Sequence, residues 1–348
     1  MSDNRRIVIL AEGRFGLLTS KTANQIIRYD PEKVVGVIDS QLEGKTAQEI
    51  LGYGGSIPIF RNLQDALRKN PDTLLIGIAP TGGRLPENWR SIIIEAIENK
   101  LTIISGLHTY LSDDDEFSSR AKAKNVQLID LRKVPPEYEV VAKGLWKNRK
   151  TKTILTVGTD CNVGKMTASL ELHREFFRRG LKSDFVATGQ TGMLLSGKGV
   201  CVDTIVGDYI AGAIETEIEK SIKAGFEFIH VEGQGSLTHQ GYSSVTLGLM
   251  HGVMPDAMIL VHHPIRKVDD YGFSLENVNL LIELHEMILR PFKESKVIGI
   301  AMNTVKMTQA QVREAKITLE RQTGLPAADV LTTDVQILAD AILKCFNQ

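Results

Sequence analysis

Residues 151–167 carry the clearest chemical signal in this chain, the run TKTILTVGTDCNVGKMT. An apolar strand leads into a loop that begins at Gly158 and ends with Gly164 and Lys165, and a helix is expected to follow. Main-chain N–H groups of such a loop, the positive end of the helix and the lysine ammonium all converge on phosphate oxygens. The pattern therefore predicts a phosphate cradle for a nucleotide or a nucleotide-like cofactor.

The spacing of this loop differs from that of the common P-loop, G-x-x-x-x-G-K-[ST]. Five residues separate Gly158 from Gly164, and Met166 takes the place of the hydroxyl residue after the lysine. That hydroxyl is a Mg²⁺ ligand in NTPases, and a thioether is a poor ligand for so hard a cation. Thr167 points in another direction on the helix. The predicted cofactor contacts here are Gly158, Thr159, Asp160, Asn162, Val163, Gly164, Lys165, Met166 and Thr167.

Polar residues follow three further apolar segments. Glu232 ends a strand predicted over 226–231, where a carboxylate could hold a metal–phosphate complex or accept a proton from a substrate amine. Asn303 follows a strand over 297–302, and its amide could read an adenine edge. Gln190 lies in a predicted polar glycine turn after another strand, where it is offered to substrate or cofactor. We expect Gln190 and Asn303 to join the cofactor contacts.

Five of the eight histidines fall between residues 230 and 263. Their spacing is not that of a zinc site, so no metal ligand is predicted. His263 emerges at the carboxyl end of a strand over 257–261, and His239 lies in a glycine-flanked loop. Both stand where general acid–base chemistry would occur, although each also fits a hydrogen-bonded structural histidine. Asp203 and Asp208 bracket a short segment before another predicted helix, and Asp208 is the favoured functional acid of the two. The predicted catalytic residues are therefore Glu232, His239, His263 and Asp208.

Composition bounds the class of protein. The formal net charge of −1 argues against a nucleic-acid binder, and no apolar run approaches the length that spans a bilayer. The N-terminal residues lead into a predicted strand without a signal-peptide pattern, and three scattered cysteines do not make a disulfide framework. We expect a cytoplasmic protein with no membrane partner, forming a homo-oligomer of undefined size. Of the cysteines, Cys161 lies inside the cradle, where a small loop residue is favoured over a nucleophile.

The first part of the chain forms a different unit. Predicted strands at 6–10, 34–38, 73–78, 101–105 and 126–130 alternate with helical segments, the pattern of a small doubly wound sheet. Its glycine fingerprint is incomplete, and Glu12 would repel a pyrophosphate, so dinucleotide binding here stays open. We expect an α/β protein with a Rossmann-like doubly wound domain over 1–140 and a P-loop NTPase-like α/β domain over 141–348.

Several motifs resemble known families. The longer loop and the E-G-x-G element at Glu232 resemble dethiobiotin synthetase and related amide-forming enzymes. Together, G-T-D-C-N-V-G-K-M-T, A-T-G-Q-T-G-M, V-E-G-Q-G-S-L and the H-x-x-Y element His239–Tyr242 closely resemble a bacterial family long known only as a domain of unknown function. The resemblance covers essentially the entire chain, and it implies an association with D-glutamate N-acetylation.

The family resemblance leads to one hypothesis for the function, acetyl transfer from acetyl-CoA to the amine of an acidic amino acid. Coenzyme A carries a pyrophosphate and a 3′-phosphate, so the loop could hold it without the phosphoryl transfer that needs the missing hydroxyl. Glu232 or His239 would take a proton from the substrate ammonium, and Arg266 and Lys267 would pair with its carboxylates.

Two other functions remain open from the sequence. One is an ATP- and Mg²⁺-dependent ligase or synthetase of the dethiobiotin synthetase kind, in which Asp160, Thr167 and Glu232 would arrange the metal. The other is a regulatory nucleotide-binding protein with no chemistry, whose N-terminal domain senses a dinucleotide. Each function predicts a different tightest ligand among CoA, ATP and NAD.

Overall fold

The computed structural model describes residues 4–78, 83–332 and 334–346, which form two compact units. The first unit runs to Val134 and also takes in Met193–Gly197, whereas the second comprises Pro135–Gly192 and Lys198 onward. The sequence placed the change of domain after residue 140, a few residues further along the chain. No helix among the described residues has the length and the apolar run needed to cross a membrane.

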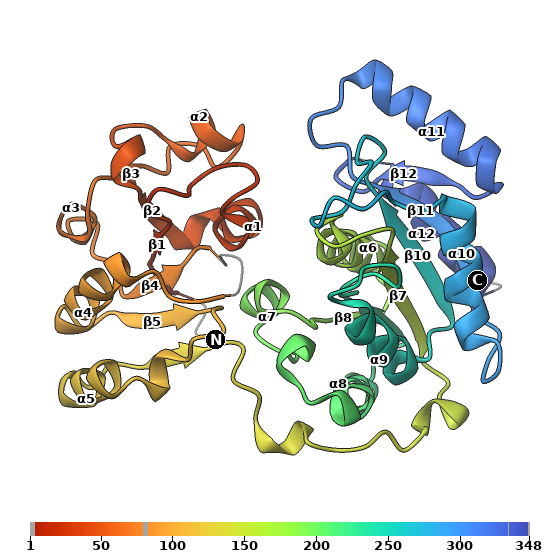
Figure 1. Ribbon diagram of the computed structural model, residues 1–348, viewed down its shortest axis with the longest axis horizontal. Coiled ribbons are helices and arrows are strands. Elements are labelled where there is room, and N and C mark those ends of the chain that lie inside the picture. Colours follow the sequence, from red (N-terminus) through yellow and green to blue (C-terminus); the bar gives the residue numbers. More distant parts are fainter. Residues whose placement is uncertain (1–3, 79–82, 333, 347–348) are drawn as a thin grey trace. The chain divides into compact units, whose positions relative to one another are not determined.

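The first unit is a six-stranded parallel sheet in the order β3-β2-β1-β4-β5-β6, which is the strand order of the Rossmann fold. Figure 1 shows its helices beside the sheet, and Leu194 near the end of α7 joins its hydrophobic core. The strands are β1 (Ile7–Leu10), β2 (Val34–Ile38), β3 (Ile59–Phe60), β4 (Thr73–Ile76), β5 (Thr102–Ser105) and β6 (Leu128–Asp130). The helices are α1 (Lys21–Tyr29), α2 (Ala47–Leu51), α3 (Leu63–Leu67), α4 (Arg90–Glu98) and α5 (Asp115–Lys124).

Two acidic residues of the first βαβ unit accept hydrogen bonds from main-chain N–H groups of the loops around them. The buried Asp39 carboxylate accepts hydrogen bonds from the main-chain N–H of Phe15 at 3.0 Å and of Gln41 at 3.1 Å. Glu12 accepts one from the N–H of Ser40 at 2.8 Å. The carboxylate that a dinucleotide fold uses to bind a ribose therefore secures the local backbone here.

The second unit is a six-stranded parallel sheet in the order β12-β11-β10-β7-β9-β8. The central strand β7 lies between β9 and β10, so the strand order reverses at β7, where open α/β sheets bind ligands. The strands are β7 (Lys152–Gly158), β8 (Ser183–Val186), β9 (Phe228–Val231), β10 (Ala257–His262), β11 (Lys296–Met302) and β12 (Ala327–Asp329). The two parallel sheets confirm the predicted fold class.

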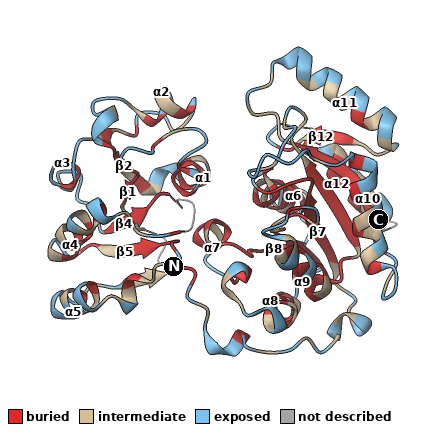
Figure 2. Cartoon of the chain, viewed as in Figure 1, coloured by how far each residue is buried: buried red, intermediate tan, exposed pale blue. Residues whose placement is uncertain are grey.

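Helices pack on this second sheet through apolar faces, and Figure 2 shows its strands as almost continuously buried. α6 and α12 contact each other and the sheet, whereas α8 and α9 pair against strands of the same sheet. Leu172 and Phe176 of α6 are fully buried, as their helical spacing predicts. The helices of this unit are α6 (Lys165–Arg178), α8 (Ile210–Lys223), α9 (Ser243–Val253), α10 (Val278–Leu289), α11 (Gln309–Thr323) and α12 (Val335–Cys345). A further helix, α7 (Gln190–Ser196), begins in this unit, and its residues from Met193 onward belong to the first unit.

The predicted glycine turn at Gln190 is wrong, because this residue begins α7. Gly192 makes the helix possible at this position, since a Cβ atom on it would lie 2.3 Å from Oε2 of Glu232. The glycine therefore serves close packing on the end of β9 rather than a turn.

Candidate functional site

The P-loop, residues 158–165, joins the end of β7 to the start of α6. Two of its residues take the left-handed backbone conformation, Asn162 with φ of 57° and Gly164 with φ of 107°. Glycine and asparagine are the residues that adopt such conformations at least cost, so the sequence builds this turn locally. The N-terminus of α6 therefore follows the carboxyl end of β7 after a short loop.

These amides and one lysine are groups that can bind an anion. Among the described residues, the N–H groups of Val163, Gly164 and Met166 donate to no other main-chain group. The ammonium of Lys165, a residue only 6% exposed, donates to the carbonyl oxygen of Asp160 at 2.8 Å across the loop. Amides at a helix N-terminus together with a buried ammonium group can bind phosphate oxygens.

Several predicted contacts support the P-loop from within the protein. Asn303 donates from Nδ2 to the carbonyl oxygen of Val163 at 3.0 Å, and the side chain of Val163 is fully buried in the core. Thr159 is hydrogen-bonded through Oγ1 to Nδ1 of His262 at 3.1 Å. Met166 is buried at the first turn of α6, and Thr167 is half-buried. Adenine reading by Asn303 stays a prediction, since this amide already holds the loop.

The tip of β9 packs directly on the P-loop. The N–H of Gly233 donates to Oγ1 of Thr156 in β7 at 3.0 Å. A Cβ atom on Gly233 would lie 1.7 Å from the carbonyl oxygen of Thr156 and 3.1 Å from Cδ of Lys165. No residue with a side chain fits at position 233. The close contact at this glycine brings Glu232 and Lys165 to the same edge of the sheet.

Glu232 is buried, with 4% of its surface exposed, and its carboxylate is held by neighbouring donors. Oε2 accepts the N–H of Thr188 at 3.0 Å and that of Gly189 at 3.3 Å, and Oε1 accepts Nε2 of Gln234 at 2.8 Å. The carboxylate thus joins the end of β9 to the turn before α7, next to Gln190. Its role as a proton acceptor remains a prediction.

Arg266, expected to pair with a substrate carboxylate, has two carboxylate partners within the protein. Its guanidinium pairs with Asp160 and with Asp270, each at 2.7 Å, and Asp270 accepts a hydrogen bond from Asn162 at 3.2 Å. Burial raises the pKa of Asp160, while the N–H of Cys161 and the charge of Arg266 oppose the rise. Arg266 therefore links the P-loop to the segment after β10, and its pairing with a substrate carboxylate stays a prediction.

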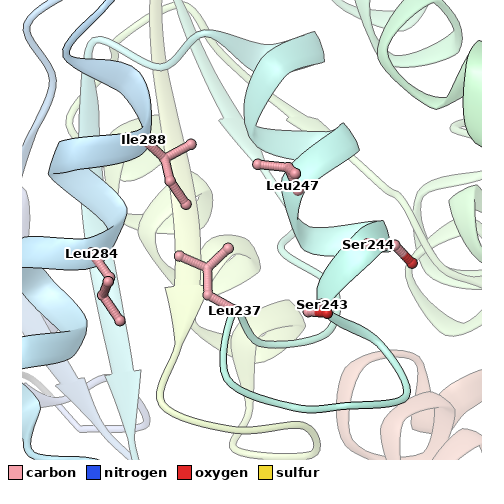
Figure 3. A pocket seen from close by; sticks show the side chains of 6 residues that line it. All are labelled: Leu237, Ser243, Ser244, Leu247, Leu284 and Ile288. Atoms are coloured by element: carbon pink, nitrogen blue, oxygen red, sulfur yellow. The ribbon is translucent and has the colours of Figure 1, made fainter.

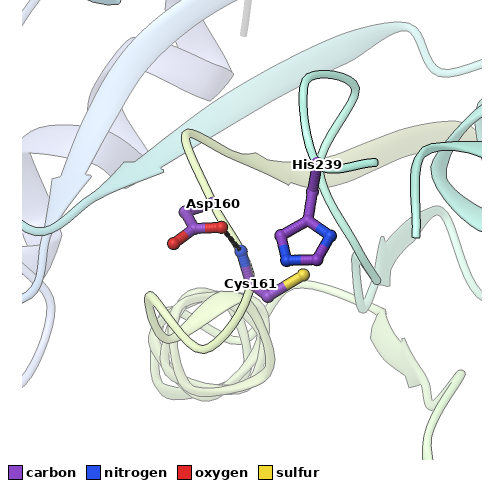
Figure 4. A group of neighbouring side chains, drawn as sticks. All are labelled: Asp160, Cys161 and His239. Atoms are coloured by element: carbon purple, nitrogen blue, oxygen red, sulfur yellow. Dashed lines mark hydrogen bonds between the residues drawn. The ribbon is translucent and has the colours of Figure 1, made fainter. Parts of the chain in front are cut away.

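His239 is brought to the P-loop from the segment between β9 and α9. It is 1% exposed, and its Nδ1 accepts the N–H of Gly241 at 3.2 Å. Its ring stacks on Tyr242 and tilts against Tyr271, with 4.9 Å between ring centroids in both pairs. Figure 4 shows the imidazole beside Cys161, a neighbour that sequence reasoning did not assign to chemistry.

Within the described ranges of the chain, Asp160, Cys161 and His239 form a group that could hold a metal ion. A carboxylate oxygen, the thiol sulfur and a ring nitrogen all lie within 4.8 Å of one another. The sequence predicted no metal ligand, because the spacing of the histidines is not that of a zinc site. Only the fold brings His239 to the other two.

The two remaining predicted catalytic residues are His263, which is half-buried, and Asp208, which is exposed. His263 follows β10, and burial lowers its pKa, helped by the charges of Arg266 and Lys306. Burial lowers the pKa of the adjacent His262 to about 4. Asp208 is exposed and makes no hydrogen bond or ion pair within the described part of the chain. The structure therefore gives Asp208 no contact that supports a catalytic role.

An apolar groove of about 440 Å³ lies near the His239 segment (Figure 3). Leu237 leads into it from the loop before α9, and Leu247, Leu284 and Ile288 line it from α9 and α10. Its polar lining consists of Ser243 and Ser244, with no charged group to orient an anion. The chemistry of this unit therefore centres on the P-loop and not on the groove.

Comparisons with known proteins agree with the two-unit architecture. Residues 140–339 match a family described as a domain of unknown function (DUF1611_C), P-loop domain, and residues 40–134 match its Rossmann-like counterpart (DUF1611_N). A solved DUF1611 family protein from Anabaena variabilis superimposes with a TM-score of 0.93 at 34% identity, covering 98% of this chain and 100% of that one.

Two curated relatives carry a named activity, and both are called D-glutamate N-acetyltransferase. The protein from Tritonibacter scottomollicae is 35% identical over 331 residues, which are 94% of this chain and 95% of the relative. The one from a Pseudoalteromonas species is 37% identical over 277 residues, which are 78% of this chain and 81% of the relative.

Proposed function

This chain belongs to the DUF1611 family, and we propose that it is an N-acetyltransferase that moves the acetyl group of acetyl-CoA to the amine of D-glutamate or a similar acidic amino acid. The names of the two curated relatives support this reaction. The observation that supports the proposal is the P-loop itself, whose helix amides and buried lysine are groups that can bind a diphosphate.

The side chains around the loop favour coenzyme A over a magnesium–nucleotide complex. Met166 is buried where an NTPase has its metal-binding hydroxyl. The two carboxylates proposed as metal ligands are already engaged, Asp160 by Arg266 and Glu232 by two main-chain amides and Gln234. A diphosphate needs only the amides and the ammonium, so CoA fits the groups that are present.

The amino-acid substrate requires cationic partners for its carboxylates. Arg266 already pairs with two aspartates, so we assign this role to Lys267 and Lys306. Lys267 is exposed, and the charge of Lys306 helps to lower the pKa of His263. The substrate ammonium must lose a proton before its nitrogen can attack, and Glu232 at the tip of β9 is the proposed acceptor. His239 is less suited to accept it, because the N–H of Gly241 donates to Nδ1 and the proton of the neutral ring then lies on Nε2, which leaves no nitrogen free to accept another.

The proposed function is tested by mixing purified protein with acetyl-CoA and D-glutamate, then measuring free thiol and N-acetylated product together. We expect equal amounts of both, and much less product with uncharged amino acids of similar size. Release of neither product with any acidic amino acid of either hand would contradict the proposal. ADP formation with ATP, Mg²⁺ and a carboxylate substrate would instead support a ligase.

A further inference from the structure

Cys161 and His239 lie together in the candidate site, although they come from segments far apart in the sequence. The sulfur lies within 4.8 Å of a ring nitrogen of His239 and of a carboxylate oxygen of Asp160. The N–H of Cys161 donates to Asp160 at 2.6 Å, which fixes the backbone under the thiol. Figure 4 shows the imidazole lying beside the sulfur atom, so any reaction of the thiol would take place against this ring.

Hydrogen bonding decides which nitrogen of His239 carries the proton. Because the N–H of Gly241 donates to Nδ1, the neutral ring carries its proton on Nε2. Nε2 is buried and makes no hydrogen bond within the described residues, while Tyr242 and Tyr271 hold the ring in place. A buried donor without an acceptor is costly, and a negatively charged sulfur beside it would satisfy it.

Two cations and a helix N-terminus lie near Asp160, the residue next to Cys161. α6 begins just beyond the loop, Arg266 pairs with the adjacent Asp160 at 2.7 Å, and the Lys165 ammonium bonds to the Asp160 carbonyl at 2.8 Å. A helix N-terminus and nearby cations are the surroundings in which protein thiols act as nucleophiles. Cys161 is 8% exposed, which would shield a thioester on its sulfur from water.

The same three residues fit a metal ion less well. A metal-binding histidine offers a lone pair to the metal and donates its other N–H to an acceptor. In His239 the nitrogen away from the cluster faces an N–H donor instead. Asp160 is also already paired with Arg266. The hydrogen bonds therefore suit a thiolate facing an imidazole N–H.

We propose that Cys161 is an acyl acceptor, which takes the acetyl group from the acyl thioester and then passes it to the amine. The inference rests on the proposed function and specifies its route. The route requires the flexible pantetheine arm to fold back toward the loop proposed to hold its diphosphate. Before the attack, Nε2 of His239 donates a hydrogen bond to the sulfur of Cys161. After the attack, it donates to the leaving sulfur of CoA.

The two steps balance. In the first, the Cys161 thiolate attacks the thioester carbonyl, a new carbon–sulfur bond forms, the old one breaks, and the electron pair leaves with the CoA thiolate. In the second, the neutral amine attacks the acetyl-cysteine carbonyl, the carbon–sulfur bond to Cys161 breaks, and the thiolate returns. The amine proton passes to Glu232 or to water, so no oxidant or reductant is needed.

The test uses the full-length protein with acetyl-CoA and no amino acid. We expect about one equivalent of CoA released in a burst and a mass increase of one acetyl group. Peptide mapping should place this group on Cys161, and D-glutamate should discharge it. Cys161→Ser is expected to lower kcat at least about a hundredfold. Cys345→Ser, which changes an exposed thiol, is the matched control and should leave both readouts intact.

Different results separate the route from the function. The wild-type protein could form N-acetylated product without a burst of CoA and without a label on Cys161. If Cys161→Ser were then also active, with an unchanged melting temperature, the cysteine route would be overturned and the proposed function would stand. Stoichiometric zinc that is lost in Cys161→Ser would overturn it as well. Neither label nor product with any acidic amino acid would overturn both proposals.

Discussion

At the scale of single residues, the P-loop lysine should dominate binding of the cofactor. We expect Lys165→Met to raise the Kd for CoA about 10- to 150-fold, which corresponds to losing about 1.5 to 3 kcal/mol of charge-assisted interaction. Titration calorimetry measures this directly. Lys182→Met is the control, since Lys182 is exposed and pairs with Glu227 on the surface. The free energy of CoA binding to this variant should differ from that of the wild type by less than about 0.5 kcal/mol. Equal affinity in both variants would contradict a role for the lysine.

Met166 leads to a prediction about metal removal. Without a hydroxyl at this position, and with Asp160 and Glu232 already engaged, acetyl transfer should proceed at an unchanged rate after treatment with a chelator. The measurement is the rate of thiol release before and after chelation, with Mg²⁺ and Zn²⁺ added back separately. A rate that disappears and returns with one of these ions would show that the site uses a metal.

The sequence predicts the parts of the site that lie in one short segment of the chain. It does not predict contacts between residues that are far apart in the chain. The P-loop is written in one contiguous run, so its glycines and its lysine were predictable. The clamp between Asp160 and Arg266 and the contact of Cys161 with His239 join segments far apart in the chain. Only the order of strands in the sheet brings those segments together, and no local pattern encodes it.

At the scale of elements, the junction of β7 and β9 depends on Gly233. A methyl group there would overlap the carbonyl oxygen of Thr156, so we expect Gly233→Ala to cost about 2 kcal/mol or more of unfolding free energy and to impair CoA binding. Gly207→Ala is the matched control, because a Cβ atom there meets no neighbour within 4 Å. Urea unfolding compares the two variants, and equal stability would show that the strands can move apart.

The strands were predictable and α7 was not, for physical reasons. Buried parallel strands such as β7 and β10 are short apolar runs rich in β-branched residues, and they stand out from their surroundings. The segment after Gln190 contains a glycine that normally signals a turn. Its helix forms because that glycine packs on Glu232, a tertiary contact that local preference cannot reveal.

At the scale of the whole molecule, buried histidines should make stability depend on pH. His230 is completely buried against Phe176, with 4.6 Å between ring centroids, and burial lowers its pKa well below 6.5. Burial also lowers the pKa of His262 and of His285 to about 4. In the unfolded chain these rings bind protons below about pH 6.5, but in the folded protein they resist protonation.

Stability should therefore be greatest above pH 6.5 and fall as the pH drops toward 4, by up to about 1.4 kcal/mol per pH unit for each such histidine. Melting temperatures measured across this range test the sign. His230→Leu should flatten the slope, while His108→Gln, which changes an exposed ring, should leave it unchanged. A stability that rises on acidification would contradict this assignment.

The division of the molecule was predictable in outline from its two runs of alternating strands and helices. The sequence did not reveal that Met193–Gly197 packs with the first unit although it lies within the second part of the chain. Leu194 and Leu195 have apolar side chains that suit either core, and composition alone cannot choose between two apolar interiors.

The central claim is that the amides and the lysine of the P-loop hold the diphosphate of coenzyme A. The most direct measurement is a calorimetric titration of the same preparation with CoA, with ATP plus Mg²⁺, and with NAD. We predict that CoA binds most tightly and that Lys165→Met removes this preference. Tighter binding of ATP with Mg²⁺, or a CoA affinity that does not change in Lys165→Met, would contradict the account.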